Sequence, residues 1–567
     1  MLSAVLSSEA LLVRSIFMQR PAILILAIGF SVIATSFVAR ANHDDDDSRD
    51  LHPGNLLVSR SVYAGRPATV SVGQVLPPGC VPGIVHIPLL LGGTTDVAVT
   101  CAKAVADGTY PTVFNNANNA GVSVDGSFGV TSPIFLDQVR TDGKLISTLA
   151  IDPTRIVTSF SSKSELALNL SSDRKTVTFV GYRGGSGFMT APNELDVSNS
   201  NTPGVVDPSN PVGSQYYRTV AEIDADGHLE ITESNAYSGN NGRAAIKAHG
   251  VYYTTGNNNN GGLSKTQLPA TQVGVNLITS TGVELVFPRS APPVPPNIDM
   301  VGIFDISQLG YPSDKPGKDN NYRGLRIHRN TLYVTKGSGG NGINTVYQVG
   351  EKGRLPLPGN APGGDLKKVP ITILPGFPTG LASNTSPPLP RFPFGIWFAD
   401  DKTLYVADEG DGTIANAAKD TESGLEKWVF DGTTWHLAYT LQQGLNLGIP
   451  YVVPNQGNPP YPNPATDGLR NLTGRRNEDG TVTIWAITST VSQSGDQGAD
   501  PNQLVMITDR VAAKTLPAGE HFTIPRRAGY GEVLRGVSFT PGTAIGCEDD
   551  NGSDRNDQGC AERQNQQ

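Results

Sequence analysis

The fold is decided by residues 394–441, which read FGIWFADDKTLYVADEGDG, an insert, and then LEKWVFDGTTWHLAYTL. Apolar residues gather in four short runs, GIWF, TLYVA, LEKWVF and HLAYTL, and turn-forming residues such as Asp-Asp-Lys and Asp-Gly-Thr-Thr lie between these runs. Short apolar runs bounded by turn residues predict β-strands. Four such strands in sequence are one blade of a β-propeller, so the stretch predicts an all-β fold.

The glycine of FGIWF has counterparts along the chain, each of which opens an apolar segment. Successive counterparts lie 65 to 80 residues apart. We name them the anchor positions: Ala167, Ala244, Gly324, Gly395, Asn471 and Gly536. A repeat of this regularity predicts one array of blades rather than several separate domains.

The sixth anchor is followed by a single apolar strand and a polar tail, so its blade lacks three strands. The N-terminal part supplies them, as LLVSRSVYAG from residue 56 and as SPIFLDQV and KLISTLAI after residue 131. A blade shared between both ends of the chain closes a ring and leaves no exposed sheet edge. We therefore predict a six-bladed β-propeller, with seven blades as the alternative in which residues 66–124 form an irregular blade.

Composition and charge narrow the class of protein. The 567 residues include 64 Gly and 42 Pro, as many tight turns require. The net charge of −9 leaves no basic stripe for phosphate backbones and argues against nucleic-acid binding. The expected organisation is a signal peptide (1–41), a disordered acidic segment (42–55), one propeller domain (56–545) and a polar, disulfide-closed tail (546–567).

The N-terminus has the pattern of an export signal. Arg14 and Arg20 precede the apolar run 21–38, and Ala39-Arg40-Ala41 matches a signal-peptidase site. We expect cleavage after Ala41 and a secreted or periplasmic monomer without a stable membrane span. The alternative is anchoring by an uncleaved helix, and either Met1 or Met18 can be the start.

Four cysteines form two sequence-local pairs, Cys80 with Cys101 and Cys547 with Cys560. In an exported chain such pairs predict disulfide bonds, although sequence alone leaves the crossed connectivities open. The chain has no Cys/His cluster of the spacing that binds structural zinc.

The repeats resemble a known family. GIWF followed by LYVADEGDG, and GLRIH followed by LYVTKGSG, resemble NHL- and YVTN-type propeller repeats. The array from residue 56 to 545 is similar to the six-bladed propellers that include the gluconolactonase/regucalcin and paraoxonase lactonases. That resemblance implies a calcium ion in the channel, held by acidic or amide residues from several inner strands.

A second register runs through the residues that precede the anchor positions. They are Leu166, Arg243, Arg323, Phe394, Arg470 and Arg535. In the propellers that this chain resembles, the first strand of each blade lines the channel, so four arginines are expected to ring one mouth. Guanidinium groups bind carboxylate or phosphate, and the ring predicts a site for a small anion, glycan or peptide. The alternative is that each arginine ties its blade to a neighbour.

Other candidate groups are fewer. Asp408, Glu409 and Asp411 lie within four residues on the same predicted face and are candidate Ca²⁺ ligands, with a solvated loop as the alternative. His249 and His328, late in inner strands, are candidate general bases. No nucleophile elbow, zinc-protease or phosphate-loop motif is present. Two hypotheses remain, a secreted binding scaffold and a Ca²⁺-dependent lactonase or esterase, and the arginines favour the first.

Overall fold

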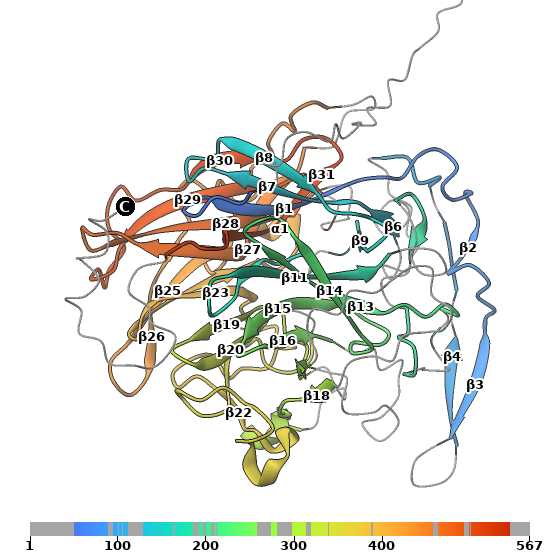
Figure 1. Cartoon of the computed structure of the whole chain (residues 1–567), viewed down its shortest axis with the longest axis horizontal. Coiled ribbons are helices and arrows are strands. Elements are labelled where there is room, and N and C mark those ends of the chain that lie inside the picture. Colours follow the sequence, from blue (N-terminus) through green and yellow to red (C-terminus); the bar gives the residue numbers. More distant parts are fainter. Residues whose placement is uncertain are drawn as a thin grey trace, which may run out of the picture. The chain divides into compact units, whose positions relative to one another are not determined.

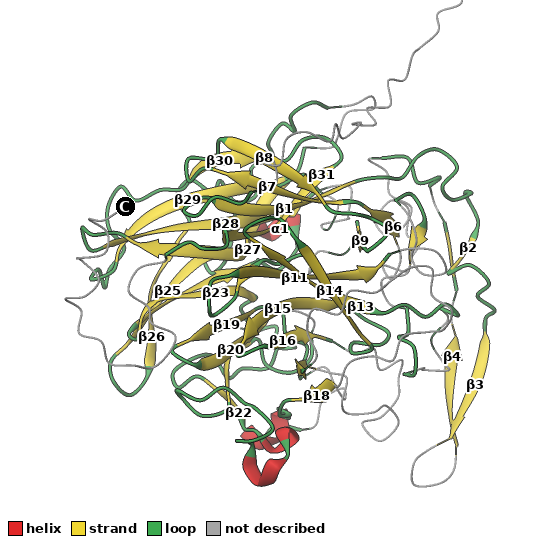
Figure 2. Cartoon of the chain, viewed as in Figure 1, coloured by secondary structure: helices red, strands yellow, loops and turns green. Residues whose placement is uncertain are grey.

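Strands make up almost all of the regular structure in the computed structural model (Figure 2). Contacts divide the chain into residues 1–46 and 47–567, and every described residue belongs to the second unit. The structure describes residues 50–88, 94–99, 101–104, 106–110, 129–160, 162, 165–184, 192–196, 200–205, 210, 212–257, 274–279, 298–312, 319–337, 340–386, 389–456, 463–492, 498 and 500–544. The expected signal peptide, the segment 42–49, Cys547, Cys560 and the tail 546–567 lie outside these residues.

Blades 2 to 5 are four-stranded antiparallel sheets built from consecutive strands, starting at the inner strand, and the four strands of blade 1 belong to a seven-stranded sheet. Blade 1 is β10 (Asn169–Leu170), β11 (Thr176–Arg183), β13 (Arg218–Asp224) and β14 (Leu229–Ser234), and blade 2 is β15 (Gly242–Ala248), β16 (Val251–Gly256), β17 (Gly274–Ile278) and β18 (Ile298–Met300). Blade 3 is β19 (Leu325–His328), β20 (Thr331–Lys336), β21 (Thr345–Val349) and β22 (Ile371–Ile373), and blade 4 is β23 (Pro393–Asp400), β24 (Thr403–Asp408), β25 (Gly424–Phe430) and β26 (Trp435–Leu441). Blade 5 is β27 (Ala465–Arg476), β28 (Thr481–Val491), β29 (Gln503–Arg510) and β30 (Thr523–Arg527).

Blade 6 joins the two ends of the chain, as predicted. Its order is β31 (Glu532–Phe539), β1 (Leu56–Val62), β7 (Ile134–Val139) and β8 (Leu145–Ala150). Figure 1 shows the red β31 beside the blue β1, and their antiparallel register pairs Leu56 with Phe539. The six-bladed propeller is therefore confirmed.

Short elements outside the blades account for the rest of the regular structure. β6 (Gly129–Ser132), β9 (Ile156–Ser159) and β12 (Leu195–Asp196) extend the sheet of blade 1, β2 (Val75–Leu76) pairs with β5 (Ala102–Lys103), and β3 (Gly83–Pro88) pairs with β4 (Thr94–Val99). The helical turns are η3 (Ile306–Leu309), η4 (Pro362–Gly364), η5 (Leu366–Lys368) and α1 (Ile414–Ala417). Among the described residues, no helix has the length and apolar character that a membrane crossing requires.

The structure corrects two expectations. The described part of residues 66–124 forms two-stranded pairs and no seventh blade, which removes the alternative. Packing begins before residue 56, because Leu51 is buried and its N–H donates to the carbonyl of Ala225. The Cys80–Cys101 disulfide is confirmed.

Five of the six anchor positions hold glycine or alanine, and at the glycines neighbouring inner strands approach each other closely. A Cβ atom on Gly324 would lie 2.2 Å from the carbonyl oxygen of Phe394, and one on Gly395 would lie 2.6 Å from that of Arg470. At Gly536 the nearest carbonyl, that of Leu166, would be 2.5 Å away. Each anchor thus lets one blade contact the backbone of the next, and apolar side chains fill the space between blades further out.

A buried carboxylate ties blade 6 to blade 5. Asp137 of β7 accepts from Nε of Arg60 at 2.8 Å and from Nη2 of Arg526, on β30, at 2.7 Å. Burial alone would raise the pKa of Asp137, but the hydrogen bonds and charges of Arg60, Thr148 and Arg526 lower it below its usual value. The ionised form therefore stabilises the closed ring.

Removal of β31 tests ring closure. A chain that ends at Gly531 lacks the inner strand of blade 6 and leaves β1 without its partner, so we expect no cooperative thermal transition. A chain that ends at Ala544 keeps β31 and is the matched control, which should melt at the full-length temperature. Cooperative melting of the shorter chain at that temperature would contradict closure by β31.

Asp137→Asn tests the tie between blades 5 and 6. The substitution should lower the free energy of unfolding by about 3–5 kcal/mol at neutral pH, because it leaves the largely buried Arg526 without its carboxylate and Arg60 with Glu532 alone. A lowered pKa gives stability that is present above the unfolded pKa and lost as pH falls through the folded pKa, so the difference from wild type should shrink in acid. Asp142→Asn, in an exposed pair with Arg140, is the control and should change stability by less than about 0.5 kcal/mol in urea denaturation.

Candidate functional site

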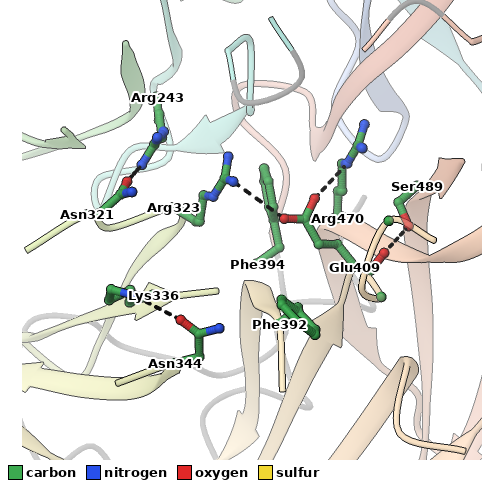
Figure 3. Close-up of polar contacts among 12 residues, drawn as sticks. Arg243, Asn321, Arg323, Lys336, Asn344, Phe392, Phe394, Glu409, Arg470 and Ser489 are labelled. Carbon is green, nitrogen blue, oxygen red and sulfur yellow. Dashed lines mark hydrogen bonds and ion pairs between the residues drawn. The ribbon is translucent and has the colours of Figure 1, made fainter. Parts of the chain in front are cut away.

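The four predicted arginines gather at one mouth of the channel. Arg243 lies in β15, Arg323 directly before β19, Arg470 in β27 and Arg535 in β31, and each is at most 5% exposed. The charge of Arg323 lowers the pKa of Arg243, and the charge of Arg470 lowers the pKa of Arg323. Neighbouring guanidinium groups therefore interact electrostatically. Figure 3 shows Arg243, Arg323 and Arg470 extending into a common region.

Two glutamates complete this arrangement, one from each blade that lacks an arginine at the register. Glu409, which follows β24 of blade 4, lies between Arg323 and Arg470 (Figure 3). Its Oε1 is 3.6 Å from Nη2 of Arg323, and its Oε2 is 3.1 Å from Nε of Arg470. Glu165 of blade 1 interacts electrostatically with Arg535 and Arg243. We name these six residues the mouth ring; in blade order they are Arg535, Glu165, Arg243, Arg323, Glu409 and Arg470.

Further partners of Arg243 and Arg535 are neutral, and most of them lie in or beside a neighbouring blade. Arg243 Nη1 donates to Asn321 Oδ1 and, at 2.9 Å, to the carbonyl of Tyr322 ahead of blade 3. Arg535 donates to Ser61 Oγ at 3.1 Å and to the carbonyls of residues 160 and 162 beside blade 1. The arginines thus lie near one another and also tie adjacent blades, as the alternative interpretation expects, while the anion site stays a prediction.

Burial makes these charges costly. It lowers the pKa of Arg243 well below its usual value, and the charge of Arg323 lowers it further, while Glu409 and Glu165 act in the opposite direction. Nε of Arg243 has no hydrogen-bond partner among the described residues. Burial also raises the pKa of Glu165, against the hydrogen bonds that its carboxylate accepts from Tyr182, Asn241 and Thr158. The mouth ring therefore holds four guanidinium groups against two carboxyl groups.

A further cation lies on the same face. Lys336, the last residue of β20, is fully buried, and its Nζ donates to Asn344 Oδ1 at 2.8 Å (Figure 3). Nδ2 of Asn344 has no partner in the described part of the chain.

The channel beneath the mouth ring is almost closed. A cavity of about 10 Å³ remains, which is room for about one water molecule. Its lining includes five anchor positions, Ala167, Ala244, Gly324, Gly395 and Asn471. A ligand larger than water does not fit into this cavity.

The three predicted calcium ligands have separate partners. Asp408 accepts from the N–H groups of Gly410 at 2.9 Å and Phe392 at 2.6 Å, and Glu409 faces the arginines. Asp411 is exposed and accepts from Thr413 N–H and Asn416 Nδ2. Calcium binding by this set stays a prediction. In the described residues, three potential ligands gather within 4.8 Å at Asp224, Asp226 and His228, in the β13–β14 turn.

The two histidines lie at the far ends of inner strands from the mouth ring. His328 is the last residue of β19 and stacks on Phe398, with ring centroids 4.5 Å apart, while its Nε2 is 3.0 Å from Asp401 Oδ1. His249 is exposed in the β15–β16 turn, with Nε2 3.1 Å from Asn330 Oδ1. Both contact the neighbouring blade, and the length of an inner strand separates each from the arginines.

The sequence analysis did not identify Glu165 as a member of the mouth ring, and it suggested a different role for Glu409. Glu165 directly precedes Leu166, which occupies the register position of the arginines. The sequence did offer a sign of this role, because a blade without arginine at that position lies between two blades that have one, and an acidic residue beside the position can pair with them. Glu409 was predicted as a metal ligand, yet its partners are Arg323 and Arg470.

Comparison with known proteins gives no family. No family model matches the chain, and no curated protein matches it. An apocarotenoid oxygenase of Synechocystis is 8% identical over 81% of this chain and 64% of its own, with a TM-score of 0.22. The haemagglutinin-neuraminidase ectodomain of parainfluenza virus 5 is 7% identical over 80% and 89%, at 0.34. An acylaminoacyl peptidase of Pyrococcus horikoshii is 9% identical over 80% and 52%, at 0.28.

The chain spans less than two thirds of the first of these structures and about half of the third. With TM-scores this low, these similarities say nothing about the function of this chain. The six-bladed architecture stands on the sheets themselves, while membership of the NHL-type family stays a prediction from the repeats.

Glu409→Gln tests the electrostatics of the mouth ring. Loss of this carboxylate leaves Arg323 and Arg470 buried beside each other, and we expect the free energy of unfolding to fall by about 3–5 kcal/mol. Glu351→Gln, whose side chain is 74% exposed, is the control and should change stability by less than about 0.5 kcal/mol in urea denaturation. Equal stability of the two variants would show that Glu409 does not neutralise the ring.

Proposed function

We propose that this protein is a binding scaffold that holds an anionic ligand at the arginine-rich mouth of its propeller. The observation that carries the proposal is the charge of the mouth ring, where four buried guanidinium groups face two carboxyl groups. Arg243 supports it most directly, since its contacts are an amide and a carbonyl oxygen and its Nε has no partner in the described part of the chain.

An anion would relieve this imbalance. Like charges repel strongly where water is excluded, and a carboxylate or phosphate group accepts paired hydrogen bonds from guanidinium groups. The ring supplies such donors from four different blades, so the fold holds them in place before the ligand arrives. The ligand class is a small anion, or an acidic glycan or peptide that presents one acidic group to the mouth.

The second hypothesis, a Ca²⁺-dependent lactonase or esterase, lacks support at this register. That mechanism needs acidic or amide residues on several inner strands, and the six register positions hold four arginines, Leu166 and Phe394. Secretion remains part of the proposal, and the Cys80–Cys101 disulfide fits an oxidising compartment.

Arg243→Met tests the proposal with inorganic phosphate as the probe. Methionine keeps much of the arginine stem and removes the charge that has no carboxylate in contact. Phosphate at about 100 times its Kd should stabilise the wild type by about 2.7 kcal/mol relative to chloride at equal ionic strength. The variant should fold and lose this difference in thermal unfolding.

Two further variants make the result decisive. Arg354→Met changes the charge equally at an exposed position and should keep the phosphate effect. Arg243→Lys keeps the charge without the planar fork and should bind more weakly than wild type. Phosphate also stabilises proteins by exclusion from their surface, so equal stabilisation of wild type and Arg243→Met would overturn the proposal.

A further inference from the structure

A second buried group on the same face lacks a partner. Asp467, near the start of β27, is 1% exposed. Its Oδ2 accepts from the N–H of Gly412 at 2.8 Å, while its Oδ1 is buried and has no hydrogen-bond partner among the described residues. The carboxylate points into the loop of residues 408–412, because a Cβ atom on Gly410 would lie 2.4 Å from Oδ2.

The surroundings of Asp467 are negative. Burial raises its pKa to about 7, and the carboxylates of Asp411, Glu409 and Asp420 raise it as well. Glu409 is neutralised by two arginines of the mouth ring. Asp411 and Asp420 accept hydrogen bonds from backbone N–H groups and an amide, and neither has a cationic partner in the described part of the chain.

We propose that Asp467 is the buried ligand of a calcium ion bound between β27 and the loop 408–412, with Asp411 and Asp420 as the further carboxylates. All donors are oxygens, and the cluster contains no histidine or cysteine, which suits Ca²⁺ better than a transition metal. This set differs from the one expected from sequence. Asp408 drops out because it is buried with both oxygens held by backbone N–H groups, and Glu409 drops out because it pairs with two arginines. Asp411 stays in the set because it is exposed and can move, and Asp467 and Asp420 join it.

The flexible coordination of calcium fits this geometry. The three carboxylates are spread more widely than the 4.8 Å within which Asp224, Asp226 and His228 gather. Ca²⁺ accepts six to eight oxygens and takes backbone carbonyls and water among them. Binding therefore draws the exposed Asp411 toward Asp467, while carbonyls of the loop and water complete the coordination.

The experiment is a calcium titration of the full chain after treatment with EDTA, by calorimetry and by thermal unfolding. We expect calcium to bind the wild type and to raise its melting temperature. Asp467→Asn keeps an acceptor for Gly412 N–H and should weaken the calcium Kd by about tenfold or more. Asp224→Asn is the matched control, because it removes a carboxylate from the other cluster, and it should keep the wild-type Kd.

Two outcomes would overturn the proposal. One is a wild type that binds no calcium, in which case a proton alone neutralises Asp467. The other is an Asp467→Asn variant that binds calcium as the wild type does. Should that variant not fold, Asp411→Asn at the exposed end of the site takes its place and should show the same loss. Arg243→Met should bind calcium normally, which separates this test from that of the anion site.

Discussion

The pairing of β1 with β31 is the contact on which the rest of the structure depends. It joins residues from opposite ends of the chain along the full length of both strands. Without it, the inner edge of β1 and the open faces of blades 1 and 5 would meet water, and an open array of blades exposes strand edges that pair with other chains. Asp137 adds a charged tie from blade 6 to blade 5 and so connects the closing blade to its neighbour as well as to itself.

Closure also determines where a ligand can bind. A closed ring presses six inner strands together, and a Cβ atom on Gly324, Gly395 or Gly536 would collide with the next blade. The cavity lined by the anchor positions has room for about one water molecule, and the repeat presents its arginines at the mouth. A residue type that recurs at one position of the repeat becomes a ring in space. Four arginines that are far apart in sequence therefore share one electrostatic environment, and the two blades without arginine supply glutamates.

The repeated strands of the blades could be predicted from the sequence, whereas elements and side chains that occur once could not. The strands of blades 3 and 4, and the shared blade 6, follow from short apolar runs between turn residues, and the structure has them at those places. The sequence analysis did not identify β18, because an outer strand of three residues has too short a pattern to be recognised. Glu165 and Asp467 were missed for a different reason. Their roles come from neighbours on other blades, and neither residue belongs to a local motif.

Glu409 connects the two sites proposed at the mouth. Its carboxylate offsets Arg323 and Arg470 on one side, and on the other it adds to the negative field at Asp467. The mouth ring has more guanidinium groups than carboxyl groups, whereas carboxylates gather at the adjoining loop 408–412 around the buried Asp467. Because Glu409 is held by the arginines, it cannot turn toward Asp467 without leaving Arg323 and Arg470 without its carboxylate. Under the two proposals, ions from outside therefore meet the two imbalances separately, an anion above the arginines and a calcium ion beside Asp467.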